Sequence, residues 1–230
     1  MLREEQFFDT EREIFSVLRA KGFSPKLIID IGASDGSWTS HCRKIFPDPQ
    51  YRLYEPLYSH LDHYRNGIDG LIAGSDRISV RPVALAEKAQ KADFFITPHS
   101  VGSSLLPLSE AKKIVVDVAT LDEDVAHITS PIDILKMDTQ GAELRILRGA
   151  KSVLSRCRIV VVETWVYRGY GPPTPLAHEI VDELAGHDFR AFGAGGAYFN
   201  PGNVLYAIDL YFGKPEILTL LGSHPFQGTR

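Results

Sequence analysis

The sequence has little cysteine, no excess of positive charge and no long apolar run. Cys42 and Cys157 are its only cysteines and form neither a CxxC pair nor a disulfide framework, which predicts two reduced thiols and a cytoplasmic protein. With 25 Lys and Arg against 29 Asp and Glu, a net formal charge of −4 argues against a basic nucleic-acid-binding face. Aliphatic stretches such as residues 159–162 are too short to span a bilayer, and residues 1–6 lack the apolar core of a signal peptide, so no membrane association is expected.

The composition is that of an ordinary globular protein. Apolar residues make up 44% of the 230 residues and charged residues 23%, which excludes a disordered chain. No internal repeat and no low-complexity linker interrupts the sequence. We therefore predict one domain over residues 1–230, beginning with an N-terminal helical segment within residues 1–25.

Short apolar runs alternate with amphipathic stretches, a pattern typical of an α/β protein. Phe8, Phe15 and Leu18 lie at helical spacing and predict a helix over residues 5–20, which Gly22 ends. Continuously apolar runs predict strands buried on both faces of a sheet. The first such strands are expected at 26–31, 51–55 and 78–81, with helices at 37–46 and 57–66. This order predicts right-handed crossovers on a parallel sheet.

The alternation breaks between residues 88 and 125. Two strand-like segments, 93–97 and 113–118, follow one another without a helix, which predicts a small antiparallel insertion with a loop at 99–106. The alternation then resumes with strands at 133–137, 158–164, 188–192 and 203–212, helices at 141–155 and 176–185, and an aromatic, proline-rich loop at 165–175. The inward face of the helix at 141–155 is expected to carry Leu147, Ala150 and Leu154.

A glycine loop after the first strand is the first sign of a ligand site. Ligands of open α/β sheets bind at the carboxyl ends of the strands, where residues 30–36 lie. Glu55 ends the second strand about 20 residues further on, at a position where an acid can accept hydrogen bonds from both hydroxyls of an adenosine ribose. A dinucleotide-binding GxGxxG motif is incomplete because Ser34 and Ser37 replace its later glycines. S-adenosylmethionine fits better, because its ammonium group favours acids such as Asp30 and Asp35. The alternative for Asp35 is that it caps the following helix.

Two carboxylates are expected at the mouth of the site. Asp138 ends the fourth strand and Glu163 the fifth, and neighbouring strands lie ~4.8 Å apart. Such a pair can share a proton and serve as a general base, or hold a divalent cation. Two carboxylates without a third ligand make a poor Mg²⁺ site, so we expect no metal. The alternative for Asp138 and Glu143 is that both simply favour a helix N-terminus.

Further candidates lie in two loops. His99 is the one histidine placed to reach an acceptor, and histidine is an effective base near neutral pH. Tyr167, Arg168 and Tyr170 follow Glu163, and aromatic rings with an arginine suit a sugar or polyol acceptor. They suit a packed lid equally well.

Several motifs together resemble the FkbM-type methyltransferases. The segment 29–36 is similar to the family's first motif, Tyr54-Glu55-Pro56 to its second-strand acid, and 83–85 to the segment near the adenine. Residues 102–105 and 120–122 resemble two short loop motifs, and 209–212 the closing strand. The most specific match is 135–143 with 147–150, which is similar to LKxDxxGAE…LxGA. Two departures are Ser34, where asparagine is frequent, and the unusually aromatic segment 163–167.

The resemblance covers residues 27–212 and implies the class I, Rossmann-like methyltransferase fold. That fold has a seven-stranded, mostly parallel sheet with an antiparallel last strand. It also implies S-adenosylmethionine as the methyl donor and S-adenosylhomocysteine as the product. The predicted site then comprises a catalytic set, a cofactor set and a substrate set. The catalytic set is Asp138, Glu163 and His99; the cofactor set is Asp30, Gly32, Ala33, Ser34, Asp35, Gly36, Glu55, Ala84, Asp138 and Gln140; the substrate set is Ser103, Ser104, Glu143, Tyr167, Arg168 and Tyr170.

We therefore predict an S-adenosylmethionine-dependent methyltransferase that modifies a hydroxyl of a small molecule, sugar or glycan. N-methylation, metal-assisted O-methylation and a non-catalytic donor-binding module stay open as alternatives. A nucleotide-dependent oxidoreductase is disfavoured by the missing glycines. The oligomeric state is left open.

Overall fold

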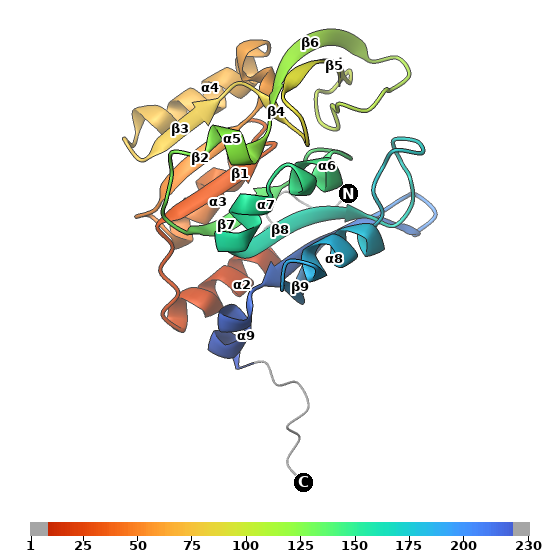
Figure 1. Ribbon diagram of the computed structural model, residues 1–230. Helices are drawn as coiled ribbons and strands as arrows, with labels where there is room; N and C mark the ends of the chain where they lie inside the picture. Colours follow the sequence, from red (N-terminus) through yellow and green to blue (C-terminus); the bar gives the residue numbers. More distant parts are fainter. Residues whose placement is uncertain (1–8, 223–230) are drawn as a thin grey trace.

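A seven-stranded sheet forms the centre of the computed structural model, which describes residues 9–222 (Figure 1). From one edge to the other its strands are β3 (Ile78–Arg81), β2 (Gln50–Tyr54), β1 (Leu27–Ile31), β7 (Ile132–Met137), β8 (Cys157–Trp165), β10 (Leu205–Gly213) and β9 (Arg190–Phe199). All pairings from β3 to β8 are parallel, whereas β10 is antiparallel to both β8 and β9. The predicted fold class is thus confirmed. In the sheet, β10 lies between β8 and β9 although it follows both in the chain.

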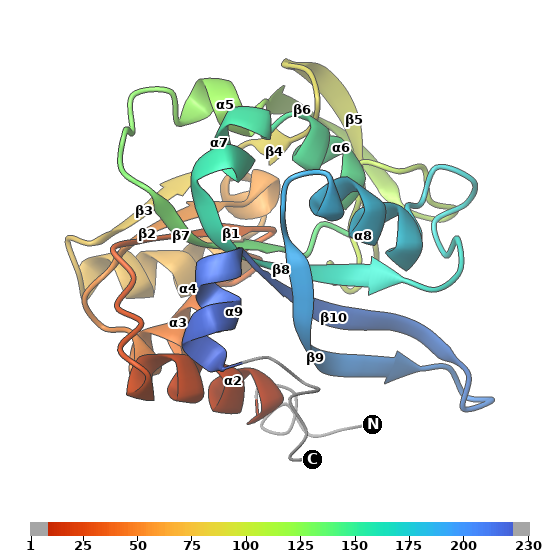
Figure 2. The ribbon, with the colours of Figure 1, turned by 60° about the horizontal axis from the view of Figure 1, so that its bottom comes forward.

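Helices cover both faces of this sheet, as Figures 1 and 2 show. One face packs against α2 (Asp9–Ala20), α3 (Ser37–Ile45), α4 (Asp62–Ala73) and α9 (Pro215–Leu221). The other packs against α5 (Leu121–Asp124), α6 (Glu143–Arg148), α7 (Lys151–Arg156) and α8 (Ala177–Ala185). Two separate apolar clusters therefore form, one on each face of the sheet.

The central strands are buried because their apolar side chains serve both clusters. Ile29 and Ile31 of β1 point to the α5–α8 side, and Ile28 points to the α2–α3 side. All three are at most 2% exposed. Such residues each stabilise the fold by about 1.5–3 kcal/mol through burial. A charged residue within such a strand, like Asp30, therefore needs a partner, which the site supplies.

A small second sheet lies at the β3 end of the molecule (Figure 1). It contains β4 (Ala84–Leu85), β6 (Lys112–Ala119) and β5 (Gln90–Ile96), in that order. The antiparallel pairing of β5 with β6 agrees with the predicted insertion at 88–125. The insertion is wider than predicted, because β4 precedes it in the chain and adds to β6 in parallel. Between β5 and β6, a bridge between Phe95 and Ser104 ties down the start of the loop.

Three helical predictions need correction. The helix predicted at 141–155 is two helices, α6 and α7, although Leu147, Ala150 and Leu154 do face the core. Gly149 lies between them, and a Cβ there would lie 2.3 Å from the carbonyl oxygen of Ala86. The stretch predicted at 57–66 is a 3₁₀ turn, η1 (Pro56–Ser59), followed by α4. Finally, α5 and α9 were not predicted at all.

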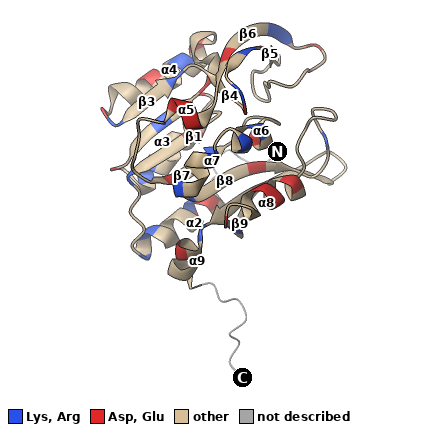
Figure 3. Cartoon of the chain, in the orientation of Figure 1, with Lys and Arg blue, Asp and Glu red and all other residues tan. Residues whose placement is uncertain are grey.

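The N-terminal helix is confirmed from Asp9 onward, and Phe15 and Leu18 are fully buried. The predicted start at residues 5–8, including Phe8, lies outside the described residues. Cys42 and Cys157 are both buried and free. No described helix has the length and apolarity needed to cross a bilayer. Lys and Arg are spread over many elements in the view of Figure 3.

Candidate active site

The glycine loop after β1 docks onto the ends of two neighbouring strands. The amides of Gly32 and Ala33 donate to the Tyr54 carbonyl at 3.0 and 3.1 Å. Gly32 has φ +73°, and a Cβ on it would lie 1.9 Å from the carbonyl oxygen of Asp138. Only glycine fits there. The loop is therefore held between the ends of β2 and β7.

Glu55, directly after β2, is tied to this loop. Its Oε2 accepts a hydrogen bond from the Ser34 amide at 2.8 Å, and its Oε1 accepts one from the Leu57 amide at 2.8 Å. The side chain is 5% exposed, and burial raises its pKa to about 7 despite these two bonds. Each carboxylate oxygen has two lone pairs, so each retains capacity for a second donor.

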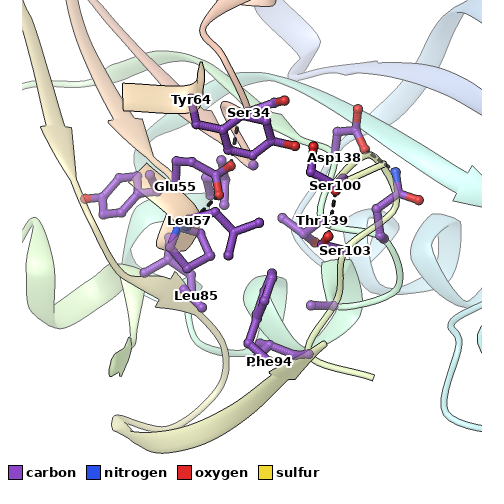
Figure 4. A pocket seen from close by; sticks show the side chains of 18 of the residues that line it. Ser34, Glu55, Leu57, Tyr64, Leu85, Phe94, Ser100, Ser103, Asp138 and Thr139 are labelled. Atoms are coloured by element: carbon purple, nitrogen blue, oxygen red, sulfur yellow. Dashed lines mark hydrogen bonds between the residues drawn. The ribbon is translucent and has the colours of Figure 1, made fainter. Parts of the chain in front are cut away.

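Glu55 lines a first cavity of about 160 Å³. Figure 4 shows Glu55, Leu57 and Tyr64 on one side of it and Asp138, Thr139 and Ser103 on the other. Its apolar walls are Leu57, Val83, Ala84, Leu85, Phe94 and Leu105. An apolar slot beside a buried carboxylate is suited to a flat ring that carries a pair of hydroxyls.

A second cavity of about 470 Å³ adjoins the first on the α2–α3 side of the sheet. Both cavities are lined by Gly32, Ser34, Tyr64, Ser100, Val101 and Asp138. Glu163 and His99, predicted as catalytic, line the second cavity with Asp138, so the structure brings these three predicted residues to one place. His99 is exposed, whereas Glu163 is 6% exposed.

Among the polar residues of the second cavity that were not predicted from sequence, four belong to α2 or to strands of the sheet. They are Glu11, Lys136, Tyr198 and Asp209. Lys136 and Asp209 had a visible signal, because each is a charge within an otherwise apolar strand. Glu11 and Tyr198 had none, because α2 and β9 reach the site only through the tertiary fold.

Lys136 links the sheet to the glycine loop. Its Nζ lies 3.1 Å from Asp30 Oδ1 and donates to the Gly32 carbonyl at 3.1 Å. Asp30 Oδ2 accepts a hydrogen bond from Thr39. Burial lowers the pKa of Lys136, but the charge and hydrogen bond of Asp30, together with the charges of Asp138 and Glu11, outweigh it and leave that pKa above its ordinary value. Asp30 is fully buried and lines neither cavity, so it reaches the site through Lys136.

Gln140 joins the two predicted catalytic carboxylates. Its Nε2 donates to Asp138 Oδ1 at 2.7 Å and to Glu163 Oε2 at 2.9 Å. Its Oε1 accepts a hydrogen bond from the Tyr170 hydroxyl at 2.5 Å. Asp138 and Glu163 therefore lie on either side of one amide group, as their places at the ends of adjacent strands predicted.

The second cavity is acidic on its far side as well. Asp209 lies directly opposite Glu163 in the β8–β10 pairing and accepts a hydrogen bond from Tyr198. Burial, and then the charge of Asp138, raise the pKa of Asp209 to about 7. Burial and the charge of Asp209 raise the pKa of Glu11 to about 8. Burial, followed by Asp138, raises the pKa of Glu163 well above its ordinary value.

Other predicted residues stabilise loops. Glu143 is fully buried and accepts hydrogen bonds from the amide and hydroxyl of Thr139 and from the Gly141 amide. Ser104 is also fully buried, and its hydroxyl donates to the Gln140 carbonyl at 2.6 Å. Neither residue lines a cavity. Ser103 does, but it lines the first cavity, as the predicted cofactor residue Ala84 also does.

The remaining predicted residues lie at the rim. Arg168 is occupied within its own loop, donating to two carbonyls and pairing with Glu179 at 3.2 Å. Tyr167 is 48% exposed and lines neither cavity. Asp35 lines the second cavity and also accepts from the Ser37 amide at the start of α3, so the predicted capping bond is present. Within residues 9–222, no three His, Cys, Asp or Glu side chains are grouped so as to hold a metal ion.

The strand order, the antiparallel β10, the glycine loop and the acid after β2 together define the class I, Rossmann-like methyltransferase fold. Solved structures agree. The FkbM methyltransferase of Methylobacillus flagellatus KT superposes with a TM-score of 0.53 at 18% identity. The match covers 81% of this chain and 43% of that one. Magnesium protoporphyrin IX methyltransferase of Synechocystis PCC 6803, solved with bound S-adenosylmethionine, has a TM-score of 0.51 at 8% identity, covering 93% of this chain and 85% of that one.

The family model of the methyltransferase FkbM domain matches residues 30–191. The chain therefore belongs to the FkbM family of S-adenosylmethionine-dependent methyltransferases, as the motifs predicted. Among curated proteins, no sequence matches this chain.

Proposed function

We propose that this chain transfers the methyl group of S-adenosylmethionine to a hydroxyl of a small molecule, sugar or glycan. One observation carries the proposal. Two adjoining cavities open at the carboxyl edge of the sheet; Glu55 lines the first, Glu163 lines the second, and Asp138 lines both. A donor in the first cavity would thus present its reactive end to the carboxylate pair.

The first cavity fits the adenosine of the donor. Glu55 has free lone pairs for both ribose hydroxyls, and Val83, Ala84 and Phe94 offer an apolar slot for the adenine. The glycine loop would face the amino-acid end of the donor. When bound, S-adenosylmethionine supplies a methyl group on a positively charged sulfur.

The second cavity supplies the groups that an alcohol acceptor needs. A hydroxyl that attacks carbon loses its proton, and a positioned base assists that loss. Burial and the charge of Asp138 raise the pKa of Glu163 well above its ordinary value, which favours one protonated and one charged carboxyl group in this pair. The charged member would accept the hydroxyl proton as the new oxygen–carbon bond forms and the carbon–sulfur bond breaks. The rest of the rate enhancement comes from holding the two reactants in line.

N-methylation is a second candidate, favoured by the acidity of the second cavity. Glu11 and Asp209 add two further carboxyl groups to those of Asp138 and Glu163. Lys136 is the one lysine or arginine that lines this cavity among the described residues, and Asp30 already pairs with it. A cationic amine acceptor would be attracted there, then lose a proton to the same pair before it attacks.

The test begins with the donor and then identifies the acceptor atom. Mass spectrometry of small molecules released from the purified protein should detect S-adenosylhomocysteine or S-adenosylmethionine. Donor carrying a deuterated methyl group should then label one or more members of a panel of monosaccharides, glycosides and amino sugars, and NMR of the product distinguishes an O-methyl from an N-methyl group. Failure to bind S-adenosylhomocysteine would contradict the proposal. Binding without transfer to any member of the panel would favour the non-catalytic module.

A further inference from the structure

We propose that Gln140 is a positioning residue that holds Asp138 and Glu163 as one proton-sharing pair, and that Tyr170 sets the orientation of Gln140. The inference rests on the proposed function in assigning the pair a catalytic role. The arrangement itself is independent of it: one side-chain amide donates to both carboxylates, at 2.7 and 2.9 Å.

The backbone of Gln140 is held without help from its side chain. The residue has φ +57°, and its carbonyl accepts a hydrogen bond from the buried Ser104 hydroxyl at 2.6 Å. The neighbouring turn is held by Glu143, which accepts from Thr139 and Gly141. A change in the Gln140 side chain therefore leaves these loop contacts in place.

The bonding pattern fixes where protons are found. The two N–H groups of the amide point at Asp138 Oδ1 and Glu163 Oε2, and a carboxyl oxygen that accepts such a bond is the less favoured place for a proton. A proton held by the pair is therefore favoured on one of the other two oxygens. Rotating the amide by half a turn would face its carbonyl oxygen toward two carboxylates, which repel it. Gln140 thus keeps the pair in one protonation pattern.

Tyr170 opposes that rotation from the other side. Its hydroxyl lies 2.5 Å from Gln140 Oε1 and 3.2 Å from the Gly102 carbonyl, and its single proton favours the shorter contact. Its ring packs edge-on against Trp165, with centroids 5.0 Å apart. Tyr170 comes from the loop after β8, so this loop is joined to the carboxylate pair through one amide.

Titratable groups from several elements surround Glu163, and their charges affect its pKa. The groups that face it are Asp138 and Lys136 from the β7 end, Glu143 from α6, Asp209 from β10, Tyr198 from β9, Tyr206 from β10 and Tyr170 from the loop. Asp138, Glu143 and Asp209 disfavour its ionised form, whereas Lys136 and the Gln140 amide favour it. Because donors to a carboxylate lower its pKa, loss of the Gln140 amide should raise it further.

The first experiment needs no acceptor. Carboxyl carbons are followed by NMR as a function of pH in protein labelled at Asp and Glu, with the Glu163 signal assigned by its loss in Glu163→Gln. We expect Gln140→Leu to move the Glu163 midpoint upward by about one pH unit or more. Gln50→Leu is the matched control, because Gln50 is exposed at the opposite end of β2, and it should leave the midpoint unchanged. An unchanged midpoint in folded Gln140→Leu would overturn the proposal.

Tyr170→Phe tests the same arrangement with the loss of one oxygen atom. It should move the midpoint in the same direction as Gln140→Leu but less. If Tyr170 acts through Gln140, the double variant should titrate like Gln140→Leu alone, whereas shifts that add would show that Tyr170 acts separately.

Calorimetry with S-adenosylhomocysteine separates this inference from the proposed function. Gln140 was predicted as a cofactor residue and lines the first cavity, but its amide is directed at the carboxylates, so Gln140→Leu should bind S-adenosylhomocysteine within about threefold of the wild type. A tenfold or greater loss of affinity, with an unmoved midpoint, would make Gln140 a donor contact instead. Failure of the wild type to bind S-adenosylhomocysteine would refute the proposed function and leave the titration as a valid test of the amide.

Discussion

Replacing Glu55 by alanine is expected to weaken the binding of S-adenosylhomocysteine at least tenfold. The ribose hydroxyls would form two charge-assisted hydrogen bonds with Glu55, each contributing about 1.5–3 kcal/mol. Loss of even one of them corresponds to about tenfold or more in affinity. The Ser34 and Leu57 amides, which donate to Glu55 at 2.8 Å, lose their partner in the free and the bound protein alike. Their loss therefore lowers the free energy of unfolding and affects the affinity little.

The pH dependence of binding gives the same prediction a second measurement. Burial raises the pKa of Glu55 to about 7, and only its ionised form accepts bonds from both hydroxyls. The affinity of the wild type should therefore rise between about pH 6 and pH 8 and then level off, and Glu55→Ala should lose this dependence. Isothermal titration calorimetry measures both quantities, and circular dichroism checks the fold. A folded Glu55→Ala protein with wild-type affinity would refute the assignment of Glu55 to the ribose.

Further predictions concern the acceptor side, metal and stability. Asp138→Asn and Glu163→Gln should each leave the affinity for S-adenosylhomocysteine nearly intact, while the rate of single-turnover methyl transfer falls by ~10²–10⁴. If Asp138→Asn loses donor binding and Glu163→Gln stays fully active, the paired role is contradicted. Methyl transfer should persist in EDTA, and activity that EDTA abolishes and Mg²⁺ restores would show otherwise. Tyr167→Ala should mainly raise the acceptor KM in steady-state kinetics, and a fall in kcat alone would argue against an acceptor contact. Because the pKa of Asp209 is raised from 3.8 to about 7, its contribution to stability is complete below pH 3.8 and lost as the pH rises through about 7. The free energy of unfolding, measured with urea, should therefore decline less over that pH interval in Asp209→Asn than in the wild type.

Strands were predictable because each is a local pattern. The runs around Ile29 and Leu135 are buried on both faces, and such continuous apolar runs have few other structural solutions. The break between α6 and α7 was not predictable in this way. It depends on Asp122, whose carboxylate accepts from the amides of Ser152 and Val153 about thirty residues along the chain. A helix start that is capped from another element leaves no signal in its own segment.

The residues of the site also divide into those that a local pattern predicts and those that depend on the tertiary fold. Glu55 and Asp138 directly follow strands and Glu163 lies near the end of β8, and the strand order of a parallel sheet places them at one edge. Glu11 reaches the cavity only because α2 packs on the sheet, which no spacing in the sequence specifies. Ser104 is the reverse case. It was predicted to contact the substrate, but its hydroxyl donates a hydrogen bond to the Gln140 carbonyl inside the protein.

The insertion of β10 between β8 and β9 has a consequence for the order in which the protein is made. Among the described residues, β9 has no neighbour in the sheet other than β10, and the second edge of β8 is also covered by β10. During synthesis, β8 and β9 therefore emerge from the ribosome before the strand that joins them. Until residues 205–213 follow, the nascent chain exposes unpaired strand edges, which are prone to pair with other chains. Asp209 arrives with that same strand, so the acidic cavity is among the last parts of the molecule to be completed.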